Sequence, residues 1–281
     1  QLRQAQAMLD KAASSNQQRK QELGDDYYRL YSIALSRLDI DSAGYYLLRR
    51  AALDTTNVDW QLQAGQFARD MRDDITTATI LIERAYSQAT LQYDAQSAIM
   101  ATTLHELANI RAKQGNVAQA QELYQQSIEI RKKVRGNDSP AVAETLNELG
   151  ILALQQKDFD NAMRYMRQSL KIRQDKLGDK SAETAESLSN IGGVYYSQNK
   201  FKQAQSYFQQ AVDIFASLSD APMRKYATAV NNLGGAYFQL GNKEQAAKQF
   251  DKAYQLYKQK LGENHPLTIN AKANRDFCNS H

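Results

Sequence analysis

The stretch NIGGVYYSQNKFKQA, residues 190–204, places two glycines, two tyrosines and a short polar turn ahead of Ala204. The pattern recurs along the chain. Steps of 42 residues from Ala204 reach an alanine each time, at Ala78, Ala120, Ala162 and Ala246. Gly192 steps in the same way to Gly150 and Gly234. Similarity at a fixed interval of this length is typical of repeat proteins, so the stretch is one copy of a tandem unit.

One copy of the unit covers residues 140–178 and predicts two helices. Leu146, Leu149 and Ala153 lie at i, i+3 and i+7, which is the spacing of an apolar helix face. Residues 155–158 interrupt this spacing, and a second helical stripe follows them. Two helices joined by so few residues form an antiparallel hairpin. We expect the two helices to approach most closely where their side chains are smallest, at Gly150 and Ala162.

The composition agrees with an all-α chain and excludes several classes of protein. Pro 3 and Gly 13 in 281 residues are too few for an all-β chain. No apolar run approaches 18 residues, so we expect no direct membrane insertion. A net charge of +4 is mild. The one short basic run, Arg131 to Arg135, is interpreted as a solvated helix end and not as a nucleic-acid patch.

These residues resemble the tetratricopeptide repeat (TPR). The resemblance rests on Gly150 and Ala162, on the bulky residue at Met166 and on Tyr195. The 42-residue period and the phrase LGENHP are similar to the kinesin-light-chain type. The resemblance implies an all-α fold, an α-α superhelix in which antiparallel helix pairs form a right-handed TPR solenoid.

The resemblance also implies one continuous solenoid with three parts. Residues 1–97 would form degenerate N-terminal TPR-like repeats, in which residues 1–20 are a second helix of an earlier unit or a cap. In this part Gln66 stands where glycine or alanine is usual. Residues 98–266 would form four 42-residue units, and residues 267–281 a C-terminal capping helix.

Proteins of this family carry a concave groove lined mainly by the first helices. The resemblance places a set of residues there: Glu106, Asn109, Glu144, Asn147, Glu148, Glu186, Asn190, Tyr196, Asn231, Asn232 and Phe238. An asparagine amide both donates and accepts, so it can pair with the backbone of an extended peptide. Tyr196 and Phe238 would supply side-chain pockets. The alternatives are a solvated helix face for the asparagines and burial against the neighbouring unit for the two aromatic residues.

The charge of these positions predicts the kind of partner. The glutamates outnumber Lys113, the one basic residue among the groove positions considered, so the groove should be acidic although the whole chain is positive. We therefore expect a neutral or basic segment of a partner protein, and neither acidic chaperone tails nor nucleic acid.

No catalytic or metal-binding arrangement emerges. The stretch HELAN begins like a zinc-protease helix, but Asn109 stands where the second histidine would be needed, so His105 is expected to be solvated or in the groove. Cys278, the single cysteine, has no basic partner nearby in sequence and is interpreted as a bystander thiol. The Gly192–Gly193 pair does not belong to a phosphate loop. We expect no cofactor, no metal and no enzymatic activity.

The sequence thus predicts a non-catalytic interaction scaffold. Two alternatives stay open: a regulatory or sensor region of a larger multidomain protein, and a structural solenoid that self-associates as a homo-oligomer. Because the sequence starts at Gln1 and not at methionine, earlier removal of a signal peptide or anchor is left open. The default compartment is cytoplasmic, with periplasmic as the alternative.

Overall fold

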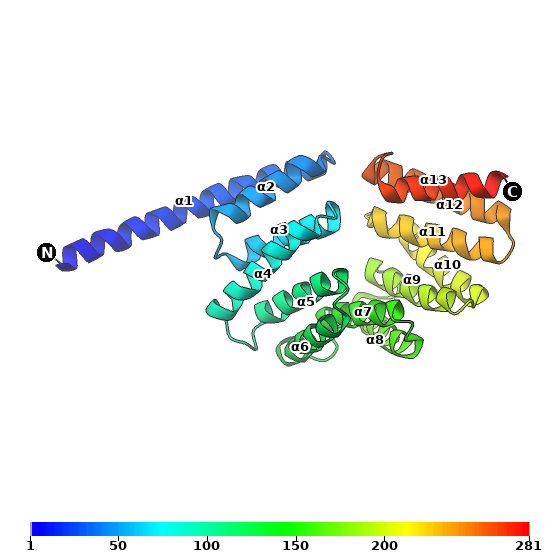
Figure 1. Ribbon diagram of the computed structural model, residues 1–281, viewed down its shortest axis with the longest axis horizontal. Coiled ribbons are helices and arrows are strands. Elements are labelled where there is room, and N and C mark those ends of the chain that lie inside the picture. The colour runs from blue at the N-terminus through cyan, green and yellow to red at the C-terminus, as the bar shows by residue number, and fades with distance from the viewer. Residues whose placement is uncertain (1, 281) are drawn as a thin grey trace. The chain divides into compact units, whose positions relative to one another are not determined.

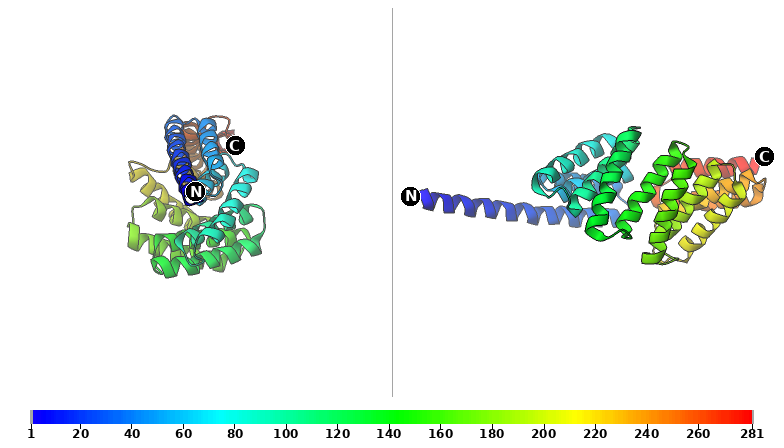
Figure 2. Two further views of the ribbon diagram at one scale, coloured as in Figure 1. Left: turned by 90° about the vertical axis from the view of Figure 1, so that its left-hand side faces the viewer. Right: turned by 90° about the horizontal axis from the view of Figure 1, so that it is seen from below.

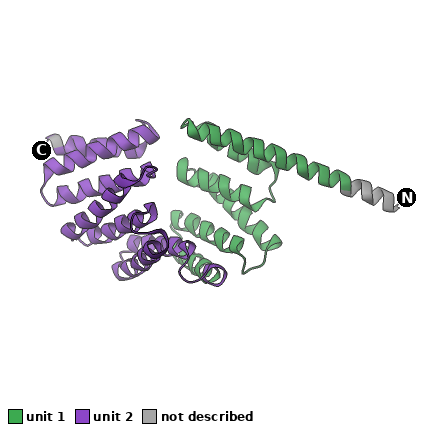
Figure 3. Ribbon diagram, turned by 180° about the vertical axis from the view of Figure 1, so that it is seen from behind, with its two compact units in different colours: residues 1–130 green, residues 131–281 purple. Residues whose placement is uncertain are grey.

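The computed structural model describes residues 2–280, with side chains for residues 11–278 and 280. The chain divides into two compact units, which are described separately. Unit 1 comprises Gln1–Ile130 and unit 2 comprises Arg131–His281 (Figure 3). Every regular element in residues 2–280 is a helix, so the predicted all-α class is confirmed.

The helices follow one another in pairs (Figure 1). Those of unit 1 are α1 (Leu2–Ser36), α2 (Ile40–Leu53), α3 (Val58–Met71), α4 (Ile75–Gln92), α5 (Ala98–Lys113) and α6 (Val117–Arg135), whose last turn belongs to unit 2. Those of unit 2 are α7 (Pro140–Gln155), α8 (Phe159–Leu177), α9 (Ala182–Ser197), α10 (Phe201–Ser217), α11 (Met223–Gln239), α12 (Lys243–Leu261) and α13 (Pro266–Ser280). Within each unit the principal contacts join helices one or two places apart in the chain.

The turn inside each pair has a constant form. One residue of the turn adopts a positive φ, which reverses the chain within a few residues: Leu38, Asp73, Gly115, Lys157, Asn199 and Gly241. An N-cap often starts the second helix. The Asp158 side chain, for example, accepts from the backbone N–H of Asn161, and the Asn242 side chain accepts from that of Gln245.

Small residues form the seam of each pair. The alanines found at 42-residue steps, Ala78, Ala120, Ala162, Ala204 and Ala246, are all 0% exposed. A Cβ atom added to Gly150 would lie 2.6 Å from Met166 and 3.4 Å from the backbone oxygen of Ala162. The close approach predicted at Gly150 and Ala162 is therefore confirmed.

Unit 1 differs from the sequence interpretation at two places. Gly65 and not Gln66 is the packing residue of α3, because a Cβ atom on Gly65 would lie 2.7 Å from Ile82. Gln66 instead donates a hydrogen bond to Glu106 at 2.7 Å. The reading of residues 1–20 as a separate second helix or cap is also wrong. From Leu2 onward they belong to the continuous helix α1, which packs against α2 as the first member of a pair.

Across the described part of the chain, none of the helices combines the length and the apolar character that crossing a membrane requires.

Candidate functional site

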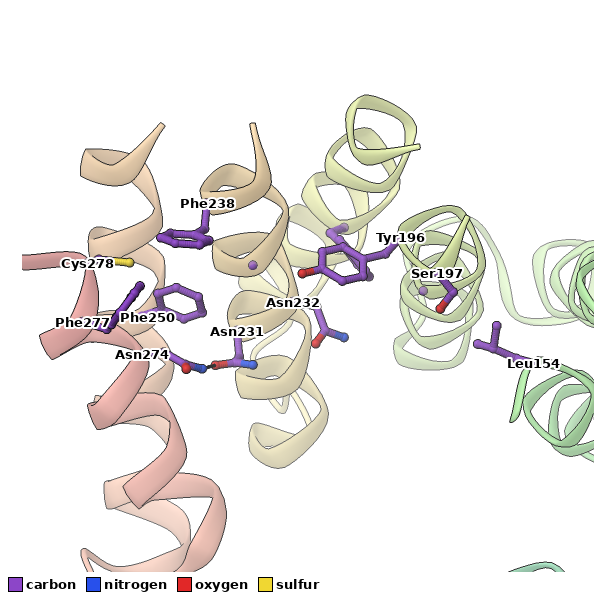
Figure 4. Close-up of a pocket in the computed structure, with 13 residues that line it drawn as sticks. Leu154, Tyr196, Ser197, Asn231, Asn232, Phe238, Phe250, Asn274, Phe277 and Cys278 are labelled. Atoms are coloured by element: carbon purple, nitrogen blue, oxygen red, sulfur yellow. Dashed lines mark hydrogen bonds between the residues drawn. The ribbon is translucent and has the colours of Figure 1, made fainter. Parts of the chain in front are cut away.

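A pocket of about 520 Å³ opens on unit 2, where α9, α11 and α13 present their side chains (Figure 4). We call it the Asn232 pocket. Its aromatic wall consists of Tyr196, Phe238 and Phe277, and the buried rings of Phe208 and Phe250 lie beneath. Its polar groups are mainly the amides of Asn231, Asn232 and Asn274. Such a mixture of apolar wall and few polar groups is typical of a binding pocket.

Two glycines keep the pocket open. A Cβ atom on Gly193 would meet only Leu154, at 3.9 Å, and one on Gly235 would meet Tyr196 at 3.6 Å, which are ordinary contacts. Their neighbours Gly192 and Gly234 face the other way. A Cβ atom on either would lie less than 3.0 Å from a phenylalanine ring of the second helix. Each of α9 and α11 thus carries one glycine for packing and one that leaves the pocket empty.

The amide of Asn232 is available to a ligand. Asn232 is half-buried, and among the described residues none donates to or accepts from its side chain. Asn231 accepts only a long hydrogen bond, 3.5 Å from the Asn274 amide nitrogen. Because each amide offers donors and an acceptor, these groups can pair with a peptide backbone.

Four of the predicted residues meet in this pocket: Tyr196, Asn231, Asn232 and Phe238. The prediction missed Asn274 and Phe277, which the last helix contributes. A signal for both was present, because Asn274 lies one 42-residue step beyond Asn232 and Phe277 one step beyond Gly235.

The other predicted asparagines bond within the protein. Asn109 donates to Glu106 at 3.1 Å and accepts from the Tyr124 hydroxyl at 2.6 Å. Asn147 is only 1% exposed, and its amide oxygen accepts from Asn190 at 2.9 Å. A ligand role for these three stays a prediction.

Glu106 is buried in unit 1 and bonded to the partly buried Arg69, while Gln66 and Asn109 also donate to it. Burial acts to raise the pKa of Glu106, but the charges of Arg69 and His105 and the hydrogen bonds from Arg69 and Gln66 hold it below its ordinary value. Glu106 therefore adds little negative charge to any surface.

In unit 2, Glu144 pairs with Arg131 at 2.8 Å, and Glu186 pairs with Arg173 at 3.3 Å and with Lys225 at 2.8 Å. Together with Glu148 and Glu183 these glutamates line a second, charged pocket of about 480 Å³. Basic residues from neighbouring helices thus offset part of the charge of Glu106, Glu144 and Glu186, and the expectation of an acidic groove stays a prediction.

Two further expectations are corrected by burial. The basic run ends helix α6, where Lys133 and Arg135 are exposed as expected, but Arg131 is 6% exposed and donates to the Ala141 carbonyl and to Thr145. His105 is neither solvated nor in a groove, since it is 3% exposed and its ring lies 5.6 Å from that of Tyr124. Both side chains face the neighbouring helix and not the solvent.

The single cysteine also lies at the Asn232 pocket. Cys278 lines the Asn232 pocket, and burial raises the pKa of its thiol, which disfavours the nucleophilic thiolate. In the part of the chain that the structure describes, no three His, Cys, Asp or Glu side chains are grouped to hold a metal ion.

Solved structures with similar folds are repeat proteins. BtubC (BKLC) from P. vanneervenii is 22% identical, with a TM-score of 0.59 over 85% of this chain and 94% of that chain. A kinesin light chain-type protein from Podosopora anserina with TPR-like repeats is 17% identical, with a TM-score of 0.56 over 73% and 96%. The APC/C hetero-tetramer Cut9–Hcn1 is 14% identical, with a TM-score of 0.61 over 94% and 45%. At these identities the similarity shows the fold.

No curated protein matches this chain in sequence. Two family models, both described as tetratricopeptide repeat, match residues 99–175 and 155–217 in one case and 227–267 in the other. Together they cover more than half of the 281 residues. With helix pairs that recur every 42 residues and neighbours of the same architecture, the chain belongs to the tetratricopeptide repeat family, in its kinesin-light-chain-like form.

Proposed function

We propose that this protein is a non-catalytic interaction scaffold whose Asn232 pocket receives an extended segment of a partner protein. Tetratricopeptide repeats generally mediate protein–protein interaction or scaffolding, and such scaffolds are generally non-catalytic. The observation that carries the proposal is the Asn232 amide without an internal partner, in a pocket that Gly193 and Gly235 leave open.

The lining suggests how the segment would be held. Asn231, Asn232 and Asn274 would pair with backbone groups of the segment, since amides can satisfy both its N–H and its carbonyl groups. One bulky apolar side chain of the segment would lie against Tyr196 and Phe238. The pocket volume of about 520 Å³ accommodates a side chain of that size together with its backbone.

The partner segment would be uncharged where it enters. No charged side chain belongs to the described lining of the Asn232 pocket. Burying a charge there would cost free energy without a compensating ion pair. This narrows the neutral or basic segment expected from the sequence to a neutral one.

A random peptide library displayed on phage would test the proposal. Peptides selected on the wild-type protein should share one bulky apolar residue in a neutral context. The pocket is then filled by Gly235→Phe, which places at this position the side chain that Phe277 supplies one step later. The selected peptides should bind this variant at least about tenfold more weakly, a loss of roughly 1.4 kcal/mol.

Gly150→Ala is the matched control. Its new Cβ atom would press on Met166, 2.6 Å away, so it should lower the melting temperature, and neither residue belongs to the lining of the Asn232 pocket. Equal peptide affinity of the wild type and Gly235→Phe would contradict the proposal.

A further inference from the structure

Helix α1 is much longer than the helix against which it packs. It spans 35 residues, whereas α2 spans 14. The described side chains of residues 11–19 are all exposed, and α1 extends as a single rod beyond α2 within unit 1 (Figure 2). Only the later part of α1 is covered, for example at Gly24, which faces the ring of Trp60, and at Ala34, which is 6% exposed.

An apolar stripe runs along α1 beside its packed face. Leu23, Leu30 and Ile33 are 44%, 40% and 48% exposed. Their spacing of seven and three residues places them on one side of the helix. The stripe does not belong to the core that α1 shares with α2, so it is free to contact another molecule.

The stripe continues as a heptad through the sequence of α1. Leucine or asparagine stands at every seventh residue, at Leu2, Leu9, Asn16, Leu23 and Leu30. The companion positions three residues later include Ala5, Ala12 and Ile33. Apolar residues in this 3–4 spacing are the seam of a coiled coil. We propose that α1 pairs with α1 of a second copy of this chain in a parallel two-stranded coiled coil.

The asparagine of the seam, Asn16, favours a second copy in parallel. Like positions face each other across a parallel pair, so Asn16 would meet Asn16 of the other copy, and one amide would donate to the other. An antiparallel pair would place Asn16 against Ala12 or Arg19 of the other copy. In a dimer with two-fold symmetry, each residue on the axis meets the same residue of the other copy, so the Asn16 pair forms without any further requirement.

The length of α1 is sufficient for a stable pair. Its 35 residues provide five heptads, and coiled coils generally need three to four. At about 1.5 Å per residue the seam would extend for about 52 Å.

Two charged residues within the seam set the strength of the dimer. Arg19 and Asp26 occupy companion positions, where each would face its own copy. Arg29 lies 3.0 Å from Asp26 and offsets its charge. The dimer should therefore be of moderate affinity, and Asp26→Leu should tighten it by about tenfold or more, since it replaces a like-charge layer with an apolar one.

Sedimentation equilibrium of the full chain over a range of concentrations tests the proposal. The mass should rise from 31.7 kDa to twice that value. The double variant Leu23→Glu, Leu30→Glu should weaken the dimer by roughly a hundredfold or more, because both leucine layers are lost. The control Leu91→Glu, Ile269→Glu changes residues that are 78% and 55% exposed elsewhere, and it should dimerise as the wild type does.

A mass of 31.7 kDa at every concentration would overturn the proposal. A dimer that survives the double variant, with an unchanged helical melting curve, would overturn it as well, because the contact would then lie on another surface.

Disulfide cross-linking tests the parallel orientation. In a Cys278→Ser background, Arg19→Cys would place two thiols in one layer of the parallel seam, and oxidation should link the copies. Gln21→Cys lies on the outer side of the seam and should give little cross-linking. Failure of Arg19→Cys to cross-link a protein that still sediments as a dimer would overturn the parallel arrangement.

Discussion

Glu106 and Asn232 occupy the same position of the repeat, three 42-residue steps apart, but their surroundings differ. In unit 1, Glu106 is 5% exposed and bonded to Arg69, Gln66 and Asn109. In unit 2, Asn232 lies half-buried in an open pocket without an internal partner. The same repeat position therefore has its hydrogen-bonding groups satisfied within the protein at Glu106, whereas at Asn232 they are available to a ligand.

The preceding first helix makes this difference. Counted from the packing glycine, which is Gly65 in α3 and Gly192 in α9, Gln66 and Arg69 take the places of Gly193 and Tyr196. A long amide and a guanidinium close the site around Glu106, whereas a glycine and an aromatic ring leave a pocket beside Asn232. The neighbours of a repeat position, and not the position alone, decide whether its polar group is free.

The largest expected effect on the free energy of unfolding comes from removing the ion pair between Arg69 and Glu106. Arg69→Met leaves the buried Glu106 carboxylate without its counter-ion, and we expect a loss of about 3–5 kcal/mol in the free energy of unfolding. Urea denaturation measures this loss. The double variant Arg69→Met, Glu106→Gln should recover most of it, since no buried charge is left. A single variant as stable as the wild type would show that the pair is not what closes this site.

The pH dependence of the same pair follows from the pKa of Glu106. This pKa is lowered in the folded protein, so the pair contributes stability above the ordinary glutamate range and loses it as the pH falls through the folded value. In Arg69→Met the charge and hydrogen bond of Arg69 are lost while those of His105 and Gln66 remain, so the pKa of Glu106 should be higher than in the wild type, and less stability should be lost as the pH falls. Urea midpoints across this pH range distinguish the two slopes, and parallel slopes would contradict the assignment.

The two glycines of α9 should respond in opposite directions. Gly192→Ala places a Cβ atom 2.7 Å from Phe208 and should cost about 1–3 kcal/mol. Gly193→Ala meets nothing closer than 3.9 Å and should stabilise by roughly 0.5–1 kcal/mol, since alanine favours a helix. Thermal unfolding compares them, and similar losses in both would mean that the pocket side of α9 is also packed.

The smallest effect on stability is expected at the available site. Asn232→Ala should change the free energy of unfolding by less than about 0.5 kcal/mol. Asn109→Ala removes two hydrogen bonds and should cost about 1–2 kcal/mol. Peptide binding should show the reverse order, with Asn232→Ala the more damaging. Equal stability losses would place a hidden partner at Asn232.

The repeat and the core could be predicted from the sequence because only small residues fit where the two helices of a pair meet. Ala162 and Gly150 pack where a larger side chain would separate the helices, so the 42-residue interval follows from their spacing. The same interval brings Tyr196, Asn231, Asn232 and Phe238 into one pocket.

The charge partners could not be predicted in the same way. Arg69 lies 37 residues before Glu106 and on a helix shifted by one residue relative to the later repeats, so a fixed step misses it. Burial of Arg131 depends on the carbonyl of Ala141 in the next helix, and a basic run carries no sign of that contact. Asn274 is a simpler case: the resemblance assigns residues 267–281 to a cap, but their side chains still follow the 42-residue interval.

The principal helix contacts within each unit join elements that are one or two places apart in the chain. No strand or distant segment fastens one end of a unit to its other end among the described residues. Under mechanical load, each unit is therefore held together mainly by contacts between neighbouring helices, and no principal contact joins its two ends in the part of the chain that the structure describes. A pulling force on its ends would detach one helix pair at a time, starting at the terminal pair, and the pairs still in place would keep their own seams.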